Sequence, residues 1–240
     1  MHEPDFDWQG TFVRRLEAVR RVFELFVQGG FGPNGQVFAG RSQDLIGLVT
    51  FATYPDTAAP LTTSHGVLLK LLKQEPPRQP DEGQTNVGDA IAEGLLRLDD
   101  AGSRRKVMIL LSDGEHNFTG PAAAPTWKPR PSAQRAKDLD VPIYCIDAGS
   151  DGPTADPESR AAAREGLKEV ANVTGGEYFT GHDADTLLRV CQTIDRLERR
   201  PIETARYRRY TEIHGAFGLA AFGLLLAAGL ISSTIGRRLP

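Results

Sequence analysis

The 240-residue sequence has few cysteines and no strong excess of charge of either sign. Its two cysteines, Cys145 and Cys191, are too few for a disulfide framework or a zinc site. Both lie in apolar segments, which predicts buried thiols. The net charge of −3 gives no basic surface of the kind that nucleic-acid binding requires, so we expect no nucleic-acid partner. The remaining composition, 40% hydrophobic and 25% charged, is typical of a globular domain.

The sequence also lacks the short motifs of several common enzyme classes. It contains no GxxxxGK[ST] phosphate-binding loop, no GxGxxG after a strand and no GxSxG nucleophile motif. The glycines of Gly29–Gly40 follow a helical pattern rather than a strand, which argues against a phosphate-binding loop there. We therefore expect that the chain is not an enzyme.

No signal peptide is recognisable in the polar, acidic start MHEPDFDWQG, and only one long uncharged run occurs. This run, Gly215–Ile235, is flanked by Arg208-Arg209 and Arg237-Arg238. At 1.5 Å per residue it would span roughly 30 Å, the thickness of a bilayer's hydrocarbon core. A buried core helix is usually shorter and lacks flanking arginines. We therefore expect a single transmembrane helix and a location in the cell membrane.

The side of the membrane on which the preceding residues lie stays open. More arginines precede the apolar run than follow it, which favours a cytoplasmic domain. A helical hairpin upstream would reverse that orientation.

Short apolar runs alternate with amphipathic patterns along the first 199 residues. Runs without alternation predict strands buried on both faces, at Leu45–Phe51, Val107–Leu111 and Val141–Ile146, and shorter strands are expected at Pro60–Thr63 and Glu177–Thr180. Helices are predicted from apolar spacings of three and four. They comprise a first helix with Phe12, Leu16, Val19, Phe23 and Phe26 on one face, Val67–Leu72, a helix with Ile91, Leu95 and Leu98, Ser132–Asp138, Ser159–Val173 and Asp183–Leu197. This alternation predicts an α/β fold with a mostly parallel sheet covered on both faces.

Polar residues at the ends of these elements are candidates for a ligand site. Asp113 directly follows the strand Val107–Leu111 and Ser112, and open α/β sheets bind ligands at the carboxyl ends of their strands. Asp113 is therefore either a ligand residue or the cap of the next loop. Thr85 or Asn86 is suited to cap the following helix. Asp147, at another strand end, is either a further carboxylate of the site or a turn residue.

Several of these segments together resemble a von Willebrand factor A domain. The segments are LIGLVTF, PLT, TNVGDAI, VMILLSDGEHN, PIYCIDAG and GGEYF, and the resemblance covers roughly residues 1–199. The RYRRYTE segment, the apolar run and the closing RRLP are similar to the bacterial membrane-bound, aerotolerance-related BatA type. The resemblance implies a Rossmann-like, doubly wound domain over 1–199, a basic linker over 200–214, a transmembrane helix over 215–235 and a short basic tail over 236–240.

The resemblance also implies a metal-ion-dependent adhesion site at one edge of the sheet. In the family this site combines a DxSxS motif after the first strand, a threonine in a later loop and an aspartate after the fourth strand. Thr85 matches the threonine and Asp113 the aspartate, and their oxygens suit Mg²⁺ or Mn²⁺.

The DxSxS motif itself does not occur in this sequence. Met1 aligns with the methionine that follows the motif, so the family's first strand and three metal ligands would lie upstream. We expect that the start codon was assigned too late or that the gene is truncated, and the sequence alone does not separate these from a genuine short form. We expect either a gap between the strands Leu45–Phe51 and Val107–Leu111 or these two strands drawn together, and weak or absent metal binding.

By family resemblance the chain is a membrane-tethered protein-binding module that contacts lipid. The partners implied are other von Willebrand factor A proteins and a MoxR-type AAA+ ATPase. A metal-independent adaptor is the main alternative. A hydrolase that uses Asp113, Glu115 and His116 with a metal is a weaker one, because adjacent loop positions lack the ligand spacing of a helix.

Overall fold

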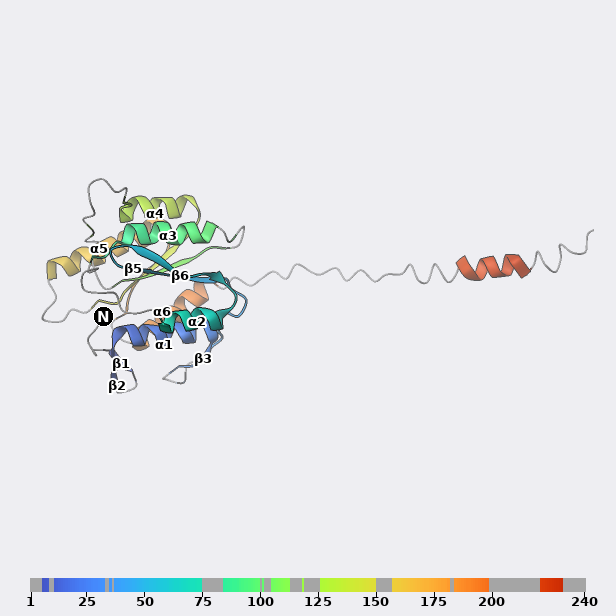
Figure 1. The fold of residues 1–240 in the computed structure, drawn as a ribbon, viewed down its shortest axis with the longest axis horizontal. Coiled ribbons are helices and arrows are strands. Elements are labelled where there is room, and N and C mark those ends of the chain that lie inside the picture. The colour runs from blue at the N-terminus through green and yellow to red at the C-terminus, as the bar shows by residue number, and fades with distance from the viewer. Residues whose placement is uncertain are drawn as a thin grey trace, which may run out of the picture. The chain divides into compact units, whose positions relative to one another are not determined.

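The computed structural model describes residues 6–8, 11–32, 35, 37–74, 84–99, 101, 105–112, 118, 126–149, 157–181, 184–198 and 221–230. The chain divides into two compact units, Met1–Arg199 and Arg200–Pro240. The first unit is an α/β domain in which helices cover both faces of the strands (Figure 1).

The strands of the first unit are β1 (Phe6–Trp8), β2 (Thr11–Val13), β3 (Gly30–Phe31), β4 (Val37–Phe38), β5 (Ile46–Phe51), β6 (Pro55–Thr62), β7 (Met108–Ser112), β8 (Ile143–Asp147) and β9 (Tyr178–Thr180). Its helices are α1 (Arg15–Gln28), α2 (His65–Gln74), α3 (Val87–Asp99), α4 (Pro129–Asp138), α5 (Pro157–Thr174) and α6 (Ala184–Glu198). Strands and helices alternate strictly from β7 onward, whereas the four strands β3–β6 precede α2 and α3 without a helix between them.

The central strand is β8, which pairs in parallel with β7 on one side and β9 on the other. Every residue of β8 is buried, as its unbroken apolar sequence predicts. Tyr144 and Ile146 face a core shared with α1 and α6, whereas Ile143 and Cys145 face a second core shared with α3, α4 and α5. The sheet therefore lies between two helical layers.

The strands β5 and β6 form a separate antiparallel pair within the same layer. Ile46 of β5 packs on the first core, as Leu111 of β7 does, and Phe51 of β5 packs on the second core, which contains Leu110. Both strands thus lie between the same helices, yet among the described residues they belong to different sheets. Of the two expected arrangements, this pairing agrees with a gap between β5 and β7.

The hydrogen bonds of β7 show which of its backbone groups face that break. The amide of Met108 donates to the carbonyl of Pro142, and the amide of Ala148 donates to the carbonyl of Ser112. Backbone groups alternate direction along a strand, so those of Ile109 and Leu111 face away from β8. Ile109 is also 39% exposed, whereas the adjacent Leu110 is 5% exposed.

Three sequence expectations were wrong in detail. Phe12 continues the helical spacing but lies in β2, which pairs with β1, and α1 begins only at Arg15. Gly29–Gly40, expected to be a loop, contains the short β3–β4 hairpin. The strand expected at Pro60–Thr63 begins at Pro55, because a tight turn after β5 returns the chain antiparallel to it.

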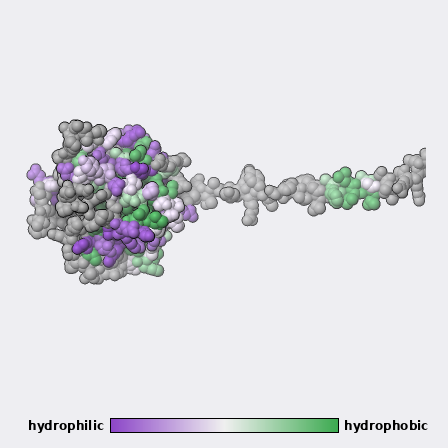
Figure 2. Space-filling view, in the orientation of Figure 1, coloured by the Kyte–Doolittle hydropathy of each residue, from purple (hydrophilic) through white to green (hydrophobic). Residues whose placement is uncertain are grey.

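The second unit contains an apolar helical segment at residues 221–230 (Figure 2). Its large apolar side chains, which include Phe222, Leu224 and Leu225, are exposed. Within the part of the chain that is described, no helix has both the length and the apolar character needed to cross a membrane. The expected span, Gly215–Ile235, extends beyond the described helical residues on both sides.

Candidate functional site

The amino end of α3 is fixed by a reciprocal cap built from Asn86 and Asp89. The backbone amide of Asp89 donates to Asn86 Oδ1 at 3.1 Å, and Asn86 Nδ2 donates to Asp89 Oδ2 at 2.7 Å. Asn86 is fully buried, so these bonds form in a shielded environment. Of the two residues proposed to cap this helix, Asn86 is therefore the cap.

This cap also attaches α3 to the carboxyl end of β5. The amide of Asn86 donates to the carbonyl of Ala52 at 2.9 Å, and its side chain donates to the carbonyl of Thr53 at 3.3 Å. The ring of Tyr54, which follows, meets the edge of the Phe118 ring with centroids 5.9 Å apart. Because Phe118 lies in the segment after β7, this contact brings that segment next to the turn after β5.

Thr85 lies at this edge, half-buried and adjacent to Asn86. Asp113, its expected metal-binding companion, lies outside the described residues, as do Glu115 and His116. The position of Thr85 thus agrees with a site at the carboxyl edge, and its distance to Asp113 stays a prediction.

A second threonine at this edge was missed from the sequence. The hydroxyl oxygen of Thr53 is buried and has no hydrogen-bond partner among the described residues. The sequence feature that could have identified Thr53 is its position just after the strand Leu45–Phe51, because Asp113 was proposed from the same kind of position. Ligands of open α/β sheets bind at the carboxyl ends of the strands, and Thr53 lies at such an end.

Asp147, considered as a third carboxylate of the site, is instead bound within the protein. It is 0% exposed and accepts hydrogen bonds from the Gly149 amide at 2.9 Å, from Arg160 Nη2 at 2.9 and 3.0 Å, and from the Tyr178 hydroxyl at 3.0 Å. Arg164 Nε lies 3.5 Å from Asp147 Oδ2. Asp147 therefore joins the end of β8 to α5 and β9, and this correction removes it from the metal site.

The titration of this cluster follows from its burial and its partners. Burial alone would raise the pKa of Asp147, but the amide of Gly149 and the guanidinium of Arg160 lower it below its ordinary value. Burial and the adjacent Asp147 carboxylate raise the pKa of Tyr178 to about 12. The carboxylate is thus charged and the phenol neutral at physiological pH.

The two cysteines are buried and unpaired, as expected. Burial raises the pKa of both thiols, Cys145 and Cys191, to about 12. Neither thiol is ionised at neutral pH, so neither is a good nucleophile or metal ligand.

The described residues do not by themselves form a Mg²⁺ coordination shell. No group of three or more histidine, cysteine, aspartate or glutamate side chains gathers in the described part of the chain. At the carboxyl edge Thr85 and Thr53 offer neutral hydroxyls, while the carboxylate of Asp89 already accepts bonds from Asn86 and from the Trp127 amide. Mg²⁺ in proteins is usually held through at least one carboxylate.

Comparison of the sequence with protein families decides the classification. The model of the von Willebrand factor type A domain matches residues 9–193. The chain belongs to this family. The two-sided α/β architecture and the cap at the carboxyl edge are therefore those of a von Willebrand factor type A (VWA) domain. No curated protein matches the sequence.

Solved structures share the fold of this VWA domain at low sequence identity. Proximal thread matrix protein 1 from the mussel byssus has a TM-score of 0.55 and 20% identity, covering 76% of this chain and 40% of that one. The chain thus spans well under half of the mussel protein. Another structure of that protein, with its MIDAS (metal-ion-dependent adhesion site) motif occupied by zinc, has a TM-score of 0.52 and 19% identity over 75% of this chain and 41% of that one.

Two bacterial structures match over most of their own length. BatB from Bacteroides thetaiotaomicron has a TM-score of 0.53 and 18% identity, covering 76% of this chain and 88% of that one. An aerotolerance-related membrane protein from Bacteroides fragilis has a TM-score of 0.57 and 18% identity, covering 81% of this chain and 92% of that one. At these identities the comparison shows the shared fold.

Proposed function

We propose that this VWA domain is a membrane-anchored protein-binding module of the BatA type, with its ligand site at the carboxyl edge near Thr85. The observation that supports this function is the junction of β5, α3 and the segment after β7, which the Asn86 cap and the Tyr54–Phe118 contact hold together. A rigid edge that displays exposed Tyr54 suits binding. The module acts by binding rather than catalysis.

Metal binding at this edge is proposed to be weak. Thr85 and Asp113 are the two ligands that match the family pattern, and Mg²⁺ or Mn²⁺ suits their oxygens. Zinc in the MIDAS motif of the mussel protein supports a divalent cation in this family. In this chain, however, the carboxylates of Asp89 and Asp147 are engaged by internal hydrogen bonds. Thr85 and Asp113 alone would leave a Mg²⁺ shell composed mostly of water.

A metal-independent adaptor is the second candidate, and the same internal bonds favour it. Partners of either form are proposed from the family: sibling VWA proteins and a MoxR-type AAA+ ATPase. Both candidates bind protein at the carboxyl edge, and they differ in whether a divalent cation contributes to that binding.

Calorimetric titration of the full chain with Mg²⁺ and Mn²⁺ tests the metal proposal. We expect no saturable binding with a Kd below about 1 mM, a value that corresponds to a binding free energy of roughly −4 kcal/mol. The matched variant Asp113→Ala should then behave as the wild type does. Submillimolar binding that Asp113→Ala abolishes would refute weak binding and favour the metal-dependent form.

The membrane anchor is proposed to be Gly215–Ile235, whose described part is an apolar helix. Its small residues four apart, such as Gly223 and Ala227, would allow close packing against another helix. The full chain should stay in the membrane fraction after a carbonate wash, whereas a variant with Leu225→Arg and Leu226→Arg should be released. Recovery of the wild-type chain in the supernatant would contradict the anchor.

A further inference from the structure

The layer of strands is interrupted by a gap that β5 and β7 border, called here the β5–β7 gap. Residues of both strands contribute to both hydrophobic cores, whereas β6, all of whose residues are described, contributes to neither. Paired strands lie about 4.8 Å apart, but the Cα atoms of β5 and β7 lie mostly more than 8 Å apart. The two strands therefore face each other across more than one strand spacing.

Backbone groups on the borders of the gap lack partners in the part of the chain that is described. The amides and carbonyls of Ile109 and Leu111 face away from β8, because those of Met108 and Ser112 are directed to it. On the other border, β5 pairs with β6 on one side and with no described strand on its other side. Such rows of backbone donors and acceptors are the groups that a further strand would pair with.

The apolar side chains beside the gap are also less buried than their place between two helical layers predicts. Ile109 is 39% exposed, and no residue of β5 is fully buried. By contrast, every residue of β8 is buried between the same two cores. The difference between β8 and the border strands shows that the gap is open to solvent.

The helix α3 is bonded to the β5–β6 side of the gap. The amide of Asn86 donates to the carbonyl of Ala52, which follows β5, at 2.9 Å. Further along the helix, the hydroxyl of Thr57 on β6 donates to Glu93 Oε1 at 2.6 Å. These two bonds fix the position of β5 and β6 relative to α3.

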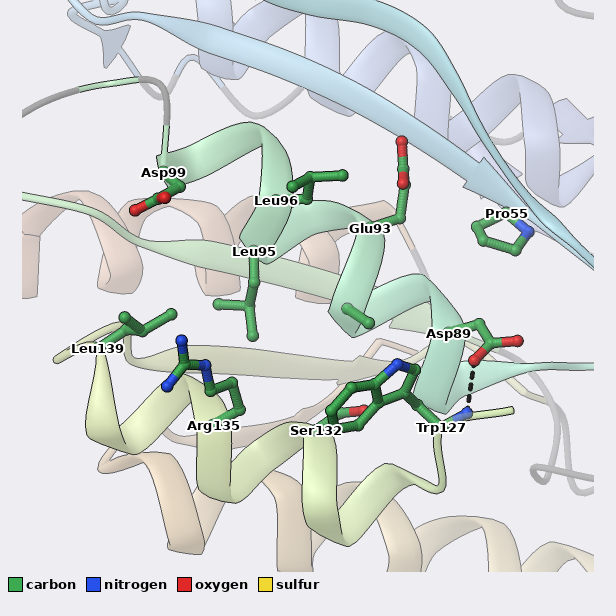
Figure 3. A pocket seen from close by; sticks show the side chains of 11 residues that line it. Pro55, Asp89, Glu93, Leu95, Leu96, Asp99, Trp127, Ser132, Arg135 and Leu139 are labelled. Carbon is green, nitrogen blue, oxygen red and sulfur yellow. Dashed lines mark hydrogen bonds between the residues drawn. The ribbon is translucent and has the colours of Figure 1, made fainter. Parts of the chain in front are cut away.

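The same helix is bonded to α4, which packs on the core beneath β8. The Trp127 amide donates to Asp89 Oδ1 at 2.6 Å, as the dashed line in Figure 3 shows, and the Ser132 hydroxyl donates to the Gly88 carbonyl at 2.9 Å. A side chain at Gly88 would collide with the carbonyl of Trp127. Because α3 is held on both sides, it keeps β5 at a fixed distance from β7 and opposes closure of the gap.

We propose that the β5–β7 gap binds one extended, apolar segment of a partner protein, which pairs with β7 as an added strand and lies beside β5. Main-chain hydrogen bonds to an unpaired strand are an established mode of peptide binding. The five residues of β7 set the length of the segment at about five residues. The proposal rests on the protein-binding function and adds a second contact surface to it.

The surroundings of the gap require an apolar residue at each position of this segment. Successive side chains of a strand point to opposite faces, and here one face is the first core, with Ile46 and Leu111, and the other is the second core, with Phe51 and Leu110. A charged side chain on either face would be buried without a partner. β-Branched and aromatic residues fit such a position best.

Binding of a strand peptide to the full chain in phosphatidylcholine nanodiscs tests the proposal, with empty nanodiscs as the blank. The probe is a fluorescein-labelled peptide, Lys-Lys-Val-Ile-Tyr-Val-Ile-Lys-Lys, and the control peptide carries N-methyl groups on alternate residues of the apolar part. N-methylation removes amide donors but keeps the apolar side chains, so it separates strand pairing from hydrophobic adsorption. By fluorescence anisotropy we expect a Kd below about 0.1 mM for the probe and binding at least about tenfold weaker for the control.

A matched pair of substitutions isolates the backbone donor of β7. Ile109→Pro removes the amide that faces the gap, whereas Ile109→Ala removes the side chain and keeps that amide. Proline is tolerated at a strand position whose amide makes no ladder bond, so pairing with β8 should persist. We expect Ile109→Pro to weaken binding about fivefold or more and Ile109→Ala less than about twofold, with urea unfolding to confirm that both variants fold. The N-methylated peptide tests the wild type independently of these variants.

Hydrogen exchange of the β7 amides locates the bound peptide. Exchange at Ile109 and Leu111 should slow when the probe binds, whereas Met108 and Leu110, whose amides are directed to β8, should change little. The proposal is overturned if the probe does not bind saturably, if both peptides bind equally well, or if exchange at Ile109 and Leu111 does not change. Slow exchange at these two amides without the probe would also overturn it, because the gap would then already be filled. These outcomes leave the carboxyl-edge function standing, because that function is tested separately with Asp113→Ala.

Discussion

Replacing Asp147 with asparagine should destabilise the domain more than any surface change of equal size. The carboxylate is 0% exposed and binds the guanidinium of Arg160, whose side chain is 11% exposed. Asparagine keeps the shape but removes the negative charge, so the buried guanidinium loses its ion pair with this carboxylate. Breaking a buried pair in this way costs about 3–5 kcal/mol, and we expect at least about 3 kcal/mol because Arg164 loses an ion pair with the same carboxylate.

Urea unfolding of the full chain, followed by tryptophan fluorescence, gives the free energy of unfolding. The control is Glu17→Gln, which breaks a pair with Arg21 whose side chains are 45% and 41% exposed. Such surface pairs contribute about 1 kcal/mol or less. If Asp147→Asn costs no more than Glu17→Gln does, the argument from burial is wrong.

The same variant predicts a change in the dependence of stability on pH. The folded-state pKa of Asp147 is lowered, so its contribution is fully present above the unfolded-state pKa, near 4, and is lost as the pH falls through the folded-state value. The difference in unfolding free energy between wild type and Asp147→Asn should be constant from about pH 5 to 7 and shrink below about pH 4. A difference that stays constant in acid would contradict the lowered pKa.

Two further substitutions test the frame of α3. Gly88→Ala should lower the melting temperature in a thermal-unfolding scan, because its Cβ would meet the Trp127 carbonyl. The control Gly166→Ala on α5 has open space around it and should be neutral or stabilise the domain by about 0.5–1 kcal/mol. Equal melting temperatures of the two variants would refute the close approach. Asn86→Ala should cost about 1–2 kcal/mol in urea unfolding through loss of the cap. Asn86→Asp should also destabilise the domain, because a carboxylate oxygen would replace the Nδ2 donor that binds the Asp89 carboxylate and the Thr53 carbonyl; wild-type stability of both variants would refute this account of the cap.

The strands with unbroken apolar sequences were predictable because their signal is local. Ile143–Asp147 is buried on both faces, as its lack of alternation indicated. The same expectation was wrong for the other two strands, because Ile109 of β7 is 39% exposed and no residue of β5 is fully buried. The start of α1 was not predictable in the same way. Phe12 fits the helical spacing, and its place in β2 depends on pairing with β1, which no pattern within the helix reveals.

Thr85 was proposed as a metal ligand only through the family resemblance, because its position before a helix by itself predicted a cap. Its place beside Asn86 agrees with the carboxyl edge, and its pairing with Asp113 stays a prediction. The role of Asp147 was not predictable, because its partners Arg160 and Tyr178 come from distant segments that only the fold brings together. The close approach of Gly88 to the Trp127 carbonyl likewise joins residues that lie far apart in the sequence.

The direction of the backbone groups in β7 has a consequence for how copies of this domain behave at high concentration. Ile109 and Leu111 direct amides and carbonyls away from β8, and Met108–Ser112 contains no charge and no proline. Natural sheet edges usually carry a charged residue or a proline, which prevents strands of neighbouring molecules from pairing. A high protein concentration would favour that pairing. A single lysine at Ile109, already 39% exposed, is therefore the change best placed to keep concentrated preparations monomeric.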